Sequence, residues 1–363
     1  MSRPASCRNF AAPKLTPEIE CQLRERARRA RGDILKMTTL AGCGHPGGSM
    51  SSIDLYQVLY SLAGVDPAEP RRPDRDRIVI SHGHTSPGVY AALGGLGFFP
   101  VDEAIAHFRQ AGGPFEGHVE RCVPGVEWST GNLGQGLSAG CGMALAAEVL
   151  GLPSRVFVVM GDGEQQKGQI AEARRFAVKY GLTRLTALVD LNRLQISGDT
   201  GEVMPQRIRA NFESDGWRVL EPLGCDPAVH DLCVTLVRET GADRVILAAH
   251  GSFKSPAPSR IARHVAGRIG AETGAEALVG FIDQAPQLAT LPGGEGICLP
   301  FFAAGGDHVG EDVLAALAKA GFRGRILPPV GLDARVPGIV AAAIARGEAV
   351  CAGACRWAKG QNP

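Results

Sequence analysis

Residues 156–200 restrict the fold of this 363-residue chain more than any other stretch. A short run of apolar, largely β-branched side chains at 156–160 predicts a buried strand, which ends in the tripeptide GDG at 161–163. After a helical stretch, a second apolar run at 185–189 ends in DLN at 190–192. This strand–helix–strand order predicts an α/β fold with mostly parallel strands.

Asp162 and Asn192 are thirty residues apart, and each follows one of these strands. Ligands of open parallel sheets bind at the carboxyl ends of the strands. The two side chains offer the hard oxygen ligands that Mg²⁺ prefers, and Gly161 and Gly163 let the backbone approach a diphosphate closely. GDG alone also occurs in ordinary strand-to-helix turns, but its combination with Asn192 favours a site for a diphosphate and a metal.

The composition is that of a soluble globular protein, with 45% hydrophobic and 21% charged residues, and the length permits two domains. A net charge of +1 gives no reason to expect nucleic acid or a membrane surface as a partner. No apolar run is long enough to span a membrane, and the N-terminus lacks the apolar core of a signal peptide. Ten cysteines follow no paired framework, which indicates a cytoplasmic setting. Cys351 and Cys355 are interpreted as free thiols in preference to a metal or redox pair.

Loops rich in glycine and histidine recur beside predicted strands and helices before residue 150. They are GCGHPGGS (42–49) before a helix at 52–62, SHGH (81–84) between a strand at 77–80 and a helix at 87–93, GH (117–118) after a helix at 102–110, and WSTGNLGQG (128–136) before a small-residue helix at 137–150. Such loops are typical of ligand contacts, although His-Pro-Gly is also good turn chemistry.

These motifs, in this order, resemble the N-terminal, diphosphate-binding half of transketolase. The resemblance runs from the first helix to about residue 240. It rests on GCGHPGGSMSSIDL (42–55), RIVISHGHTSPGVYAAL (77–93), EGHVE (116–120), VEWSTGNLGQGLSAGCGMA (126–144), GDGEQQKGQ (161–169) and DLNRLQISG (190–198).

The resemblance implies thiamine diphosphate and Mg²⁺ as cofactors. Asp162, Asn192 and the carbonyl of Leu194 would hold the metal, Gly163 and His84 would contact the diphosphate, and His45 and His118 would move protons near the reacting carbon. The residues expected to act in catalysis are thus His45, His84 and His118, and those expected to bind the cofactor are Gly131, Asn132, Leu133, Gly161, Asp162, Gly163, Asn192 and Leu194.

Two features depart from the family pattern. The glutamate that activates the cofactor lies in a pyrimidine-binding domain that this sequence does not contain, so the resemblance implies a separate partner chain, as in two-gene transketolases. The family usually has Glu where this chain has Lys167. That Glu belongs to an acidic network between two cofactor sites, so either the partner has changed to match, or coupling between sites is altered. Alternatively, Lys167 simply pairs with a carboxylate of the partner.

The last 120 or so residues predict a second parallel α/β array with its own core. The expected strands are 244–249, 277–282, 296–300 and 325–327, and the expected helices are 259–273, a segment near 287, 310–320 and 336–346.

This part resembles the small class II chelatases of the sirohydrochlorin cobaltochelatase type. The motifs are ILAAHGS (246–252), GFIDQAPQL (280–288), LPFFAAGGDHVGEDV (299–313) and RILPPVGLDARVPGIVAAAI (325–344). The resemblance implies that His250 and His308 bind Co²⁺, Ni²⁺ or Fe²⁺, that Asp312 matches the acid after the second histidine, and that Asp283 stands in for another family acid. A catalytically silent copy that pairs two chains is the alternative.

We therefore expect two three-layer αβα domains with mostly parallel sheets: residues 1–241, transketolase-like, and 242–363, chelatase-like. The expected function is ketol transfer, in which this chain and its partner together move a two-carbon unit between sugar-like substrates as a split transketolase. A homodimer of this chain within such a heteromer is expected. The alternative is a metal-inserting protein of the chelatase type whose N-terminal half is a docking scaffold. A third possibility is that both halves act on one pathway.

Overall fold

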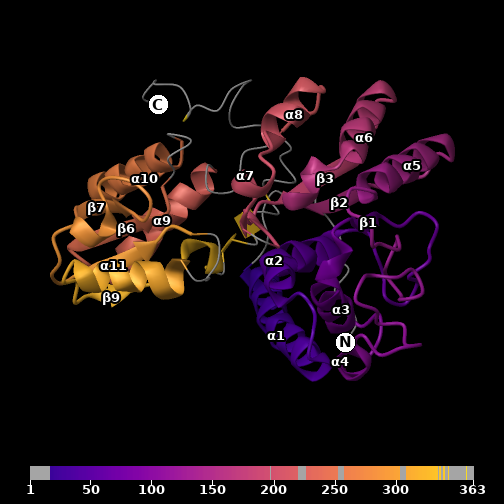
Figure 1. Cartoon of the computed structure of the whole chain (residues 1–363), viewed down its shortest axis with the longest axis horizontal. Helices are drawn as coiled ribbons and strands as arrows, with labels where there is room; N and C mark the ends of the chain where they lie inside the picture. The colour runs from indigo at the N-terminus through magenta and orange to yellow at the C-terminus, as the bar shows by residue number, and fades with distance from the viewer. Residues whose placement is uncertain are drawn as a thin grey trace. The chain divides into compact units, whose positions relative to one another are not determined.

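Three parallel strands form the sheet of the first part of the chain, in the order β1-β2-β3 (Figure 1). They are β1 (Arg77–Ile80), β2 (Val156–Gly161) and β3 (Leu185–Asp190). The central strand β2 is buried because it has a neighbour on each side, and the side chains of residues 156–160 are at most 2% exposed. The register pairs Ile80 with Val159 and Gly161 with Asp190, so the three strands end at the same edge of the sheet.

The computed structural model describes residues 17–196, 198–219, 226–251, 257–302, 308–333, 335–336, 338–339, 342 and 357. The chain divides into two compact units, Met1–Val219 and Leu220–Pro363. Among the described residues, no helix is long and apolar enough to cross a membrane.

Helices α5 (Gly136–Val149) and α6 (Gly168–Lys179) pack on the sheet of the first unit. Their apolar side chains form one core with those of β1, β2 and β3. Gly140 permits close packing of α5, because a Cβ atom there would lie 2.4 Å from Cγ2 of Val158. Helices α1 (Pro17–Ala41), α2 (Pro46–Leu62), α3 (Ser86–Gly95) and α4 (Val101–His107) pack against one another.

The remaining elements of the first unit are short and lie in loops. They are the 3₁₀ turns η2 (Gly83–Thr85) and η3 (Gly163–Gln166), the hairpin of β4 (Leu194–Gln195) and β5 (Gly198–Asp199), and the helices α7 (Thr200–Val203) and α8 (Ile208–Ser214). None of them was expected from the sequence, because such short elements depend on contacts made by the folded loops.

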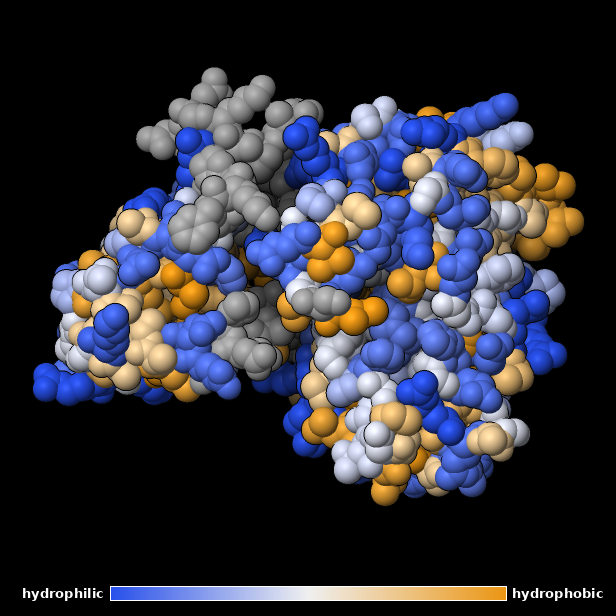
Figure 2. Space-filling view, viewed as in Figure 1, coloured by the Kyte–Doolittle hydropathy of each residue, from blue (hydrophilic) through white to orange (hydrophobic). Residues whose placement is uncertain are grey.

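Several apolar side chains of the first unit face solvent. At the end of α5, Val149 is 78% and Leu150 is 69% exposed, and an apolar patch marks the outer tip of this helix in Figure 2. Phe176 of α6 and Tyr180, which directly follows this helix, are also exposed.

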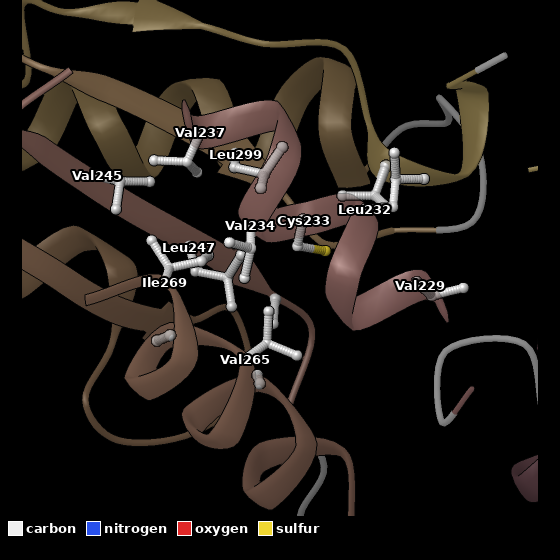
Figure 3. Close-up of a cluster of buried hydrophobic side chains, with 14 of the residues drawn as sticks. Val229, Leu232, Cys233, Val234, Val237, Val245, Leu247, Val265, Ile269 and Leu299 are labelled. Atoms are coloured by element: carbon white, nitrogen blue, oxygen red, sulfur yellow. The ribbon is translucent and has the colours of Figure 1, made fainter. Parts of the chain in front are cut away.

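The second unit has a four-stranded parallel sheet in the order β7-β6-β8-β9. The strands are β6 (Arg244–Ala249), β7 (Glu276–Phe281), β8 (Ile297–Pro300) and β9 (Arg325–Ile326). Helices α9 (Pro227–Thr240) and α10 (Ala257–Thr273) share one core with β6 and β8, shown in Figure 3. A second core joins the sheet to η5 (Leu288–Thr290), the π-helical turn η6 (His308–Val313) and α11 (Leu314–Lys319). Alternate residues of β6 enter the two cores, so helical elements cover both faces of the sheet.

The expected α/β class with mostly parallel sheets is confirmed. The segment near 287 forms a 3₁₀ turn, and the helix expected at 310–320 begins as a π-helical turn. Most of the helix expected at 336–346 lies outside the described residues. The units divide before α9, ahead of the domain boundary expected after residue 241. The reason is that Val229, Cys233 and Val237 of α9 are buried in the core of the second unit.

Candidate functional site

The carboxyl ends of β2 and β3 bring the predicted metal ligands to one place. Asp162 accepts hydrogen bonds from the backbone N–H of Gly163 at 2.9 Å and from that of Arg193 at 2.6 Å. The amide oxygen of Asn192 accepts the N–H of Leu194 at 2.9 Å. The turn that carries Asn192 and Leu194 is therefore held against Asp162, and Arg193 adopts a left-handed conformation (φ 62°) within it.

The chemistry of this donor set fits a hard divalent cation. A carboxylate, an amide oxygen and a backbone carbonyl are the ligands that Mg²⁺ takes, with phosphate oxygens and water completing its shell. Burial raises the pKa of Asp162, and a bound cation would favour the ionised form. Within the described residues, no group of three or more His, Cys, Asp and Glu side chains could hold a metal.

Histidines cluster beside these strand ends. His45 is the N-cap residue of α2, and its ring centroid lies 5.1 Å from that of His84 in η2. His82, which follows β1, lies 5.9 Å from His84 and is 3% exposed. Burial lowers the pKa of His82 and of His84 to about 4, and it also lowers that of His45, so these rings are neutral near pH 7. Neutral imidazole can accept or donate a proton, as proton transfer requires.

The third predicted catalytic residue, His118, lies in a loop that α3 fixes. The Tyr90 hydroxyl lies 3.0 Å from the Glu116 carbonyl and 3.2 Å from the His118 carbonyl, so its single proton is available to either. The Ser86 hydroxyl donates to the Gly117 carbonyl at 2.9 Å. A positive charge on His118 would lower the pKa values of both His45 and His84, which places the three rings in one electrostatic environment.

The loop with Gly131, Asn132 and Leu133 approaches the same edge. Thr130 donates its backbone N–H to Val119 at 3.0 Å, and its side chain packs directly on Gly83, where a Cβ atom would overlap it at 1.5 Å. A Cβ atom at Gly131 would meet nothing within 4 Å. The backbone is thus open to a ligand at Gly131 and tightly packed at Gly83.

Glu164 connects these loops, although it was not among the predicted site residues. It is 2% exposed and accepts hydrogen bonds from the Ser81 hydroxyl and the Gly134 N–H at 2.7 Å, and from the Gly161 N–H at 2.9 Å. Burial raises its pKa. The sequence shows an acidic residue directly after GDG, which could have drawn attention to Glu164. Its partners Ser81 and Gly134 are distant in sequence, so the contacts themselves could not be predicted.

A buried polar network lies behind the metal loop. Ser51 and Ser52 of α2 donate to the carboxylate of Asp190 at 2.8 and 2.6 Å. The Nε2 atom of His82 lies 3.1 Å from both Ser52 Oγ and the Tyr56 hydroxyl. This network fixes α2, and with it His45, to the ends of β1 and β3.

Lys167 is exposed at the start of α6, and its Cβ would lie 2.6 Å from a Cβ added at Gly134. In the part of the chain that the structure describes, it has no ion-pair partner. Its predicted effect on coupling between sites stays a prediction.

In the second unit, His250 and Asp283 follow the neighbouring strands β6 and β7. His250 Nδ1 lies 3.0 Å from a carboxylate oxygen of Asp283. His308 begins η6, but its side chain lies outside the described residues, so whether it meets His250 stays a prediction.

Known proteins resemble this chain. Residues 29–238 match the family "Transketolase, thiamine diphosphate binding domain". A 6-deoxy-6-sulfo-D-fructose transketolase subunit from Clostridium sp. is 38% identical over 56% of this chain and 74% of that protein. One of the subunits of an apulose-4-phosphate transketolase from Phocaeicola vulgatus is 40% identical over 53% of this chain and 69% of that protein.

A solved structure supports the same relationship. A crystal structure of a Pichia stipitis transketolase variant matches with a TM-score of 0.51 and 25% identity, over 71% of this chain and 36% of that one. The family match covers more than half of the chain and includes the three strand ends, the histidine loops and GDG. The chain therefore belongs to the transketolase family through its thiamine diphosphate-binding domain, and with it to the transketolase-like transferases.

Proposed function

We propose that this chain is one subunit of a split transketolase, which depends on thiamine diphosphate and Mg²⁺ and transfers a two-carbon ketol unit between sugar-like substrates. The observation that carries this proposal is the turn of Asn192 held against Asp162 beside the pair His45 and His84. Oxygen ligands and neutral imidazoles at one sheet edge suit a metal-bound diphosphate and proton transfer.

In this proposal Asp162, Asn192 and the Leu194 carbonyl hold Mg²⁺. Gly161, Gly163 and His84 contact the diphosphate, and residues 131–133 contact the rings of the cofactor. When bound, the cofactor supplies the carbanion chemistry of the reaction. Glu164 and Asp190 hold the loops in place.

His45 and His118 would exchange protons with the hydroxyl and carbonyl oxygens of the substrate. The lowered pKa of His45 keeps its ring neutral, so it can accept a proton at neutral pH. Tyr90 and Ser86 anchor residues 116–118 and so fix the loop that carries His118. A fixed loop limits the conformational entropy lost when substrate binds.

A second chain with the pyrimidine-binding domain would complete the site, and two copies of this chain would pair within the heteromer. The relatives from Clostridium and Phocaeicola are both named as transketolase subunits, which supports a divided enzyme. The exposed free thiols of Cys43 and Cys122 support a reducing cytoplasm as the setting.

Titration calorimetry with thiamine diphosphate and Mg²⁺, with and without the partner chain, tests the proposal. We expect tight binding only with the partner, and at least a hundredfold weaker binding for Asp162→Ala, because the metal loses its carboxylate ligand. Asp74→Ala, a partly exposed carboxylate paired with Arg72, is the matched control and should bind normally. Absence of binding with the partner, or unchanged affinity in Asp162→Ala, would contradict the proposal.

The pair His250 and Asp283 favours a second candidate function, in which the C-terminal unit binds Co²⁺, Ni²⁺ or Fe²⁺ for insertion into a tetrapyrrole. The chelatase-like assignment of this unit, including His308 and Asp312, remains part of this proposal. Elemental analysis after dialysis against each metal tests it: the double variant His250→Ala and His308→Ala should lose the metal. Equal metal content in the double variant and the unaltered chain would contradict metal binding and favour the alternative, a catalytically silent domain that pairs two chains.

A further inference from the structure

The turn that follows helix α4 contacts the loops of both histidines that are proposed to exchange protons with substrate. The ring of Phe108 packs against Gly44, where a Cβ atom would lie 3.2 Å from Cε1. The guanidinium of Arg109 packs against Gly117, where a Cβ atom would lie 2.6 Å from Nε and 2.9 Å from Cζ. Each of the two glycines directly precedes one of these histidines. Two consecutive residues therefore join the His45 loop to the loop of the second histidine.

Backbone and ring contacts fix the conformation of this turn. Arg109 is left-handed, with φ 58°, and its N–H donates to the Phe115 carbonyl at 2.8 Å. Phe115 is itself fixed, because its buried ring has its centroid 5.4 Å from that of Tyr90 in α3. The ring centroid of Phe108, a residue only 3% exposed, lies 6.3 Å from that of Tyr90. Left-handed conformations persist only where surrounding contacts hold them, and they cluster at functional sites.

Two sets of contacts hold the loop of His118. The hydroxyls of Tyr90 and Ser86 lie within hydrogen-bonding distance of the carbonyl oxygens of residues 116–118. Arg109 packs instead on the Cα atom of Gly117, where only glycine leaves room for the guanidinium. All three of Arg109, Gly117 and His118 line one cleft of about 610 Å³. Arg109 therefore restrains this loop at the point where it borders the cleft.

The same guanidinium places a permanent positive charge beside the histidine cluster. The ring centroids of His45 and His84 are 5.1 Å apart, so a proton on one ring disfavours a proton on the other. Burial lowers the pKa of His45, and the charge of Arg109 lowers it further, ahead of any charge on His118. A guanidinium stays charged at any pH at which the protein is folded. Its effect on the cluster is therefore constant, whereas that of His118 varies with pH.

Other ionisable groups near this cluster act against the guanidinium or are neutral. The carboxylates of Glu116 and Glu120 line the cleft and would favour a protonated imidazole. In the part of the chain that the structure describes, no hydrogen bond or ion pair joins them to Arg109, so its charge is not cancelled in a pair. The Cys43 thiol lies 3.3 Å from the Ala41 carbonyl, and α1 packs the uncharged Thr38 against the same loop.

We propose that Arg109 is a positioning residue of the site, which clamps the loop of His118 and keeps protons off the rings of His45 and His84. The two parts of this role depend on different properties of the side chain. The clamp requires the flat guanidinium face that packs on Gly117, whereas the exclusion of protons requires only a positive charge. Lysine would keep the charge without the flat face, and glutamine would keep neither. The catalytic meaning of this inference rests on the proposed function, but its structural basis can be tested without it.

A pH titration of the full chain by NMR, without partner or cofactor, tests the effect of the charge. The ring signal of His45 is assigned by its absence from His45→Gln. We expect its titration midpoint to rise in Arg109→Gln, because a neighbouring positive charge is lost, and to stay unchanged in Arg109→Lys. The matched control Arg121→Gln, an exposed arginine that does not line the cleft, should titrate as the unaltered chain does. The same midpoint in Arg109→Gln and the unaltered chain would overturn the inference.

Gly117→Ala tests the contact itself. The added Cβ atom would lie 2.6 Å from Nε of Arg109, so the guanidinium must leave its place. This variant should raise the His45 midpoint as Arg109→Gln does. The double variant should add no further rise, because both changes remove one interaction. An unchanged midpoint in Gly117→Ala, or additive effects in the double variant, would show that this contact does not place the charge.

Kinetics of the chain with its partner, thiamine diphosphate and Mg²⁺ test the clamp. In both Arg109→Gln and Arg109→Lys we expect kcat to fall about 10- to 100-fold with little change in KM, because a small displacement of a catalytic group is costly. In Arg109→Gln the acid limb of the kcat/KM profile should also move to higher pH. Arg121→Gln should match the unaltered chain.

The outcomes of these measurements separate this inference from the proposed function. A raised KM with unchanged kcat would assign Arg109 to substrate binding and overturn its positioning role. Unchanged kcat in both Arg109 variants would overturn the clamp. Absence of ketol transfer in the unaltered heteromer would contradict the proposed function, and the NMR titrations would still decide whether Arg109 acts on His45.

Discussion

At the scale of single residues, buried ionisable groups hold the strand ends in place. Glu164 and His82 are almost fully buried, yet each has hydrogen-bond partners on separate elements. The Nδ1 atom of His82 lies 3.1 Å from the Val159 carbonyl, which assigns the proton of the neutral ring to Nδ1. Nε2 is then free to accept a hydrogen bond from the Tyr56 hydroxyl, because Ser52 donates its one proton to Asp190. Protonating this ring would place a charge in the core.

His82 makes stability depend on pH. Its pKa is about 4 in the folded chain and about 6.5 when unfolded, so the unfolded state binds the proton first as pH falls. The stability contributed by the neutral ring is present above pH 6.5 and is lost as the pH falls toward 4. Between pH 7.5 and 4.5 the resulting loss in the free energy of unfolding is about 2.5 kcal/mol.

Urea unfolding of His82→Gln, followed by tryptophan fluorescence at pH 7.5 and 4.5, checks this prediction. The amide of glutamine does not titrate. The free energy of unfolding of the variant should therefore fall by about 2.5 kcal/mol less than that of the unaltered chain across this pH interval. His84 and the carboxylates titrate in both proteins and cancel in the comparison. The same loss in both proteins would contradict it.

At the scale of elements, the strand ends and their loops could be predicted from the sequence, because apolar runs end at glycine, histidine and asparagine motifs and parallel strands end together. The links between the loops could not. Glu164 reaches Ser81 across 83 positions, and the left-handed Arg109 depends on closure of its loop by Phe115. Helix α9 had readable signals, an Asp226 cap and a left-handed Gly241, and was still not predicted.

Gly83 gives a prediction at this scale, because it is the contact between η2 and the 126–135 loop. Gly83→Ala would place a Cβ atom 1.5 Å from Oγ1 and 2.4 Å from Cβ of Thr130, so one loop must move. We expect affinity for thiamine diphosphate with Mg²⁺ and partner to fall at least tenfold, measured by titration calorimetry. Gly47→Ala, where a Cβ atom meets nothing within 4 Å, is the control.

Removing the obstructing side chain should restore binding to Gly83→Ala. The double variant with Thr130→Gly vacates the volume that the new methyl group needs, so its affinity should exceed that of Gly83→Ala alone. If Gly83→Ala binds as tightly as Gly47→Ala, the packing of these loops does not shape the site.

At the scale of the whole molecule, the chain has two units, each with a buried core of its own. Ile170 lies in the core of the first unit and Leu247 in that of the second, and both are fully buried. The proposed cofactor site lies within the first unit. Ligand binding should therefore stabilise that unit directly.

Differential scanning calorimetry tests this division. Ile170→Ala and Leu247→Ala should each reduce the free energy of unfolding of their own unit by about 2–5 kcal/mol. Each should therefore lower the midpoint temperature of a different thermal transition. With the partner present, thiamine diphosphate and Mg²⁺ should raise the transition that Ile170→Ala lowers. If both substitutions lower one common transition, the two cores unfold together.

The strand β3 has a consequence for how the cell handles this protein. It is the last strand of its sheet within the described residues, and Ala187 and Val189 on it are only half-buried. An edge of this kind is a template for strand addition by a neighbouring molecule. A copy of this chain whose β3 edge is left uncovered would present that template to other nascent chains and to the quality-control machinery. Cover of this edge therefore matters for the yield of folded protein.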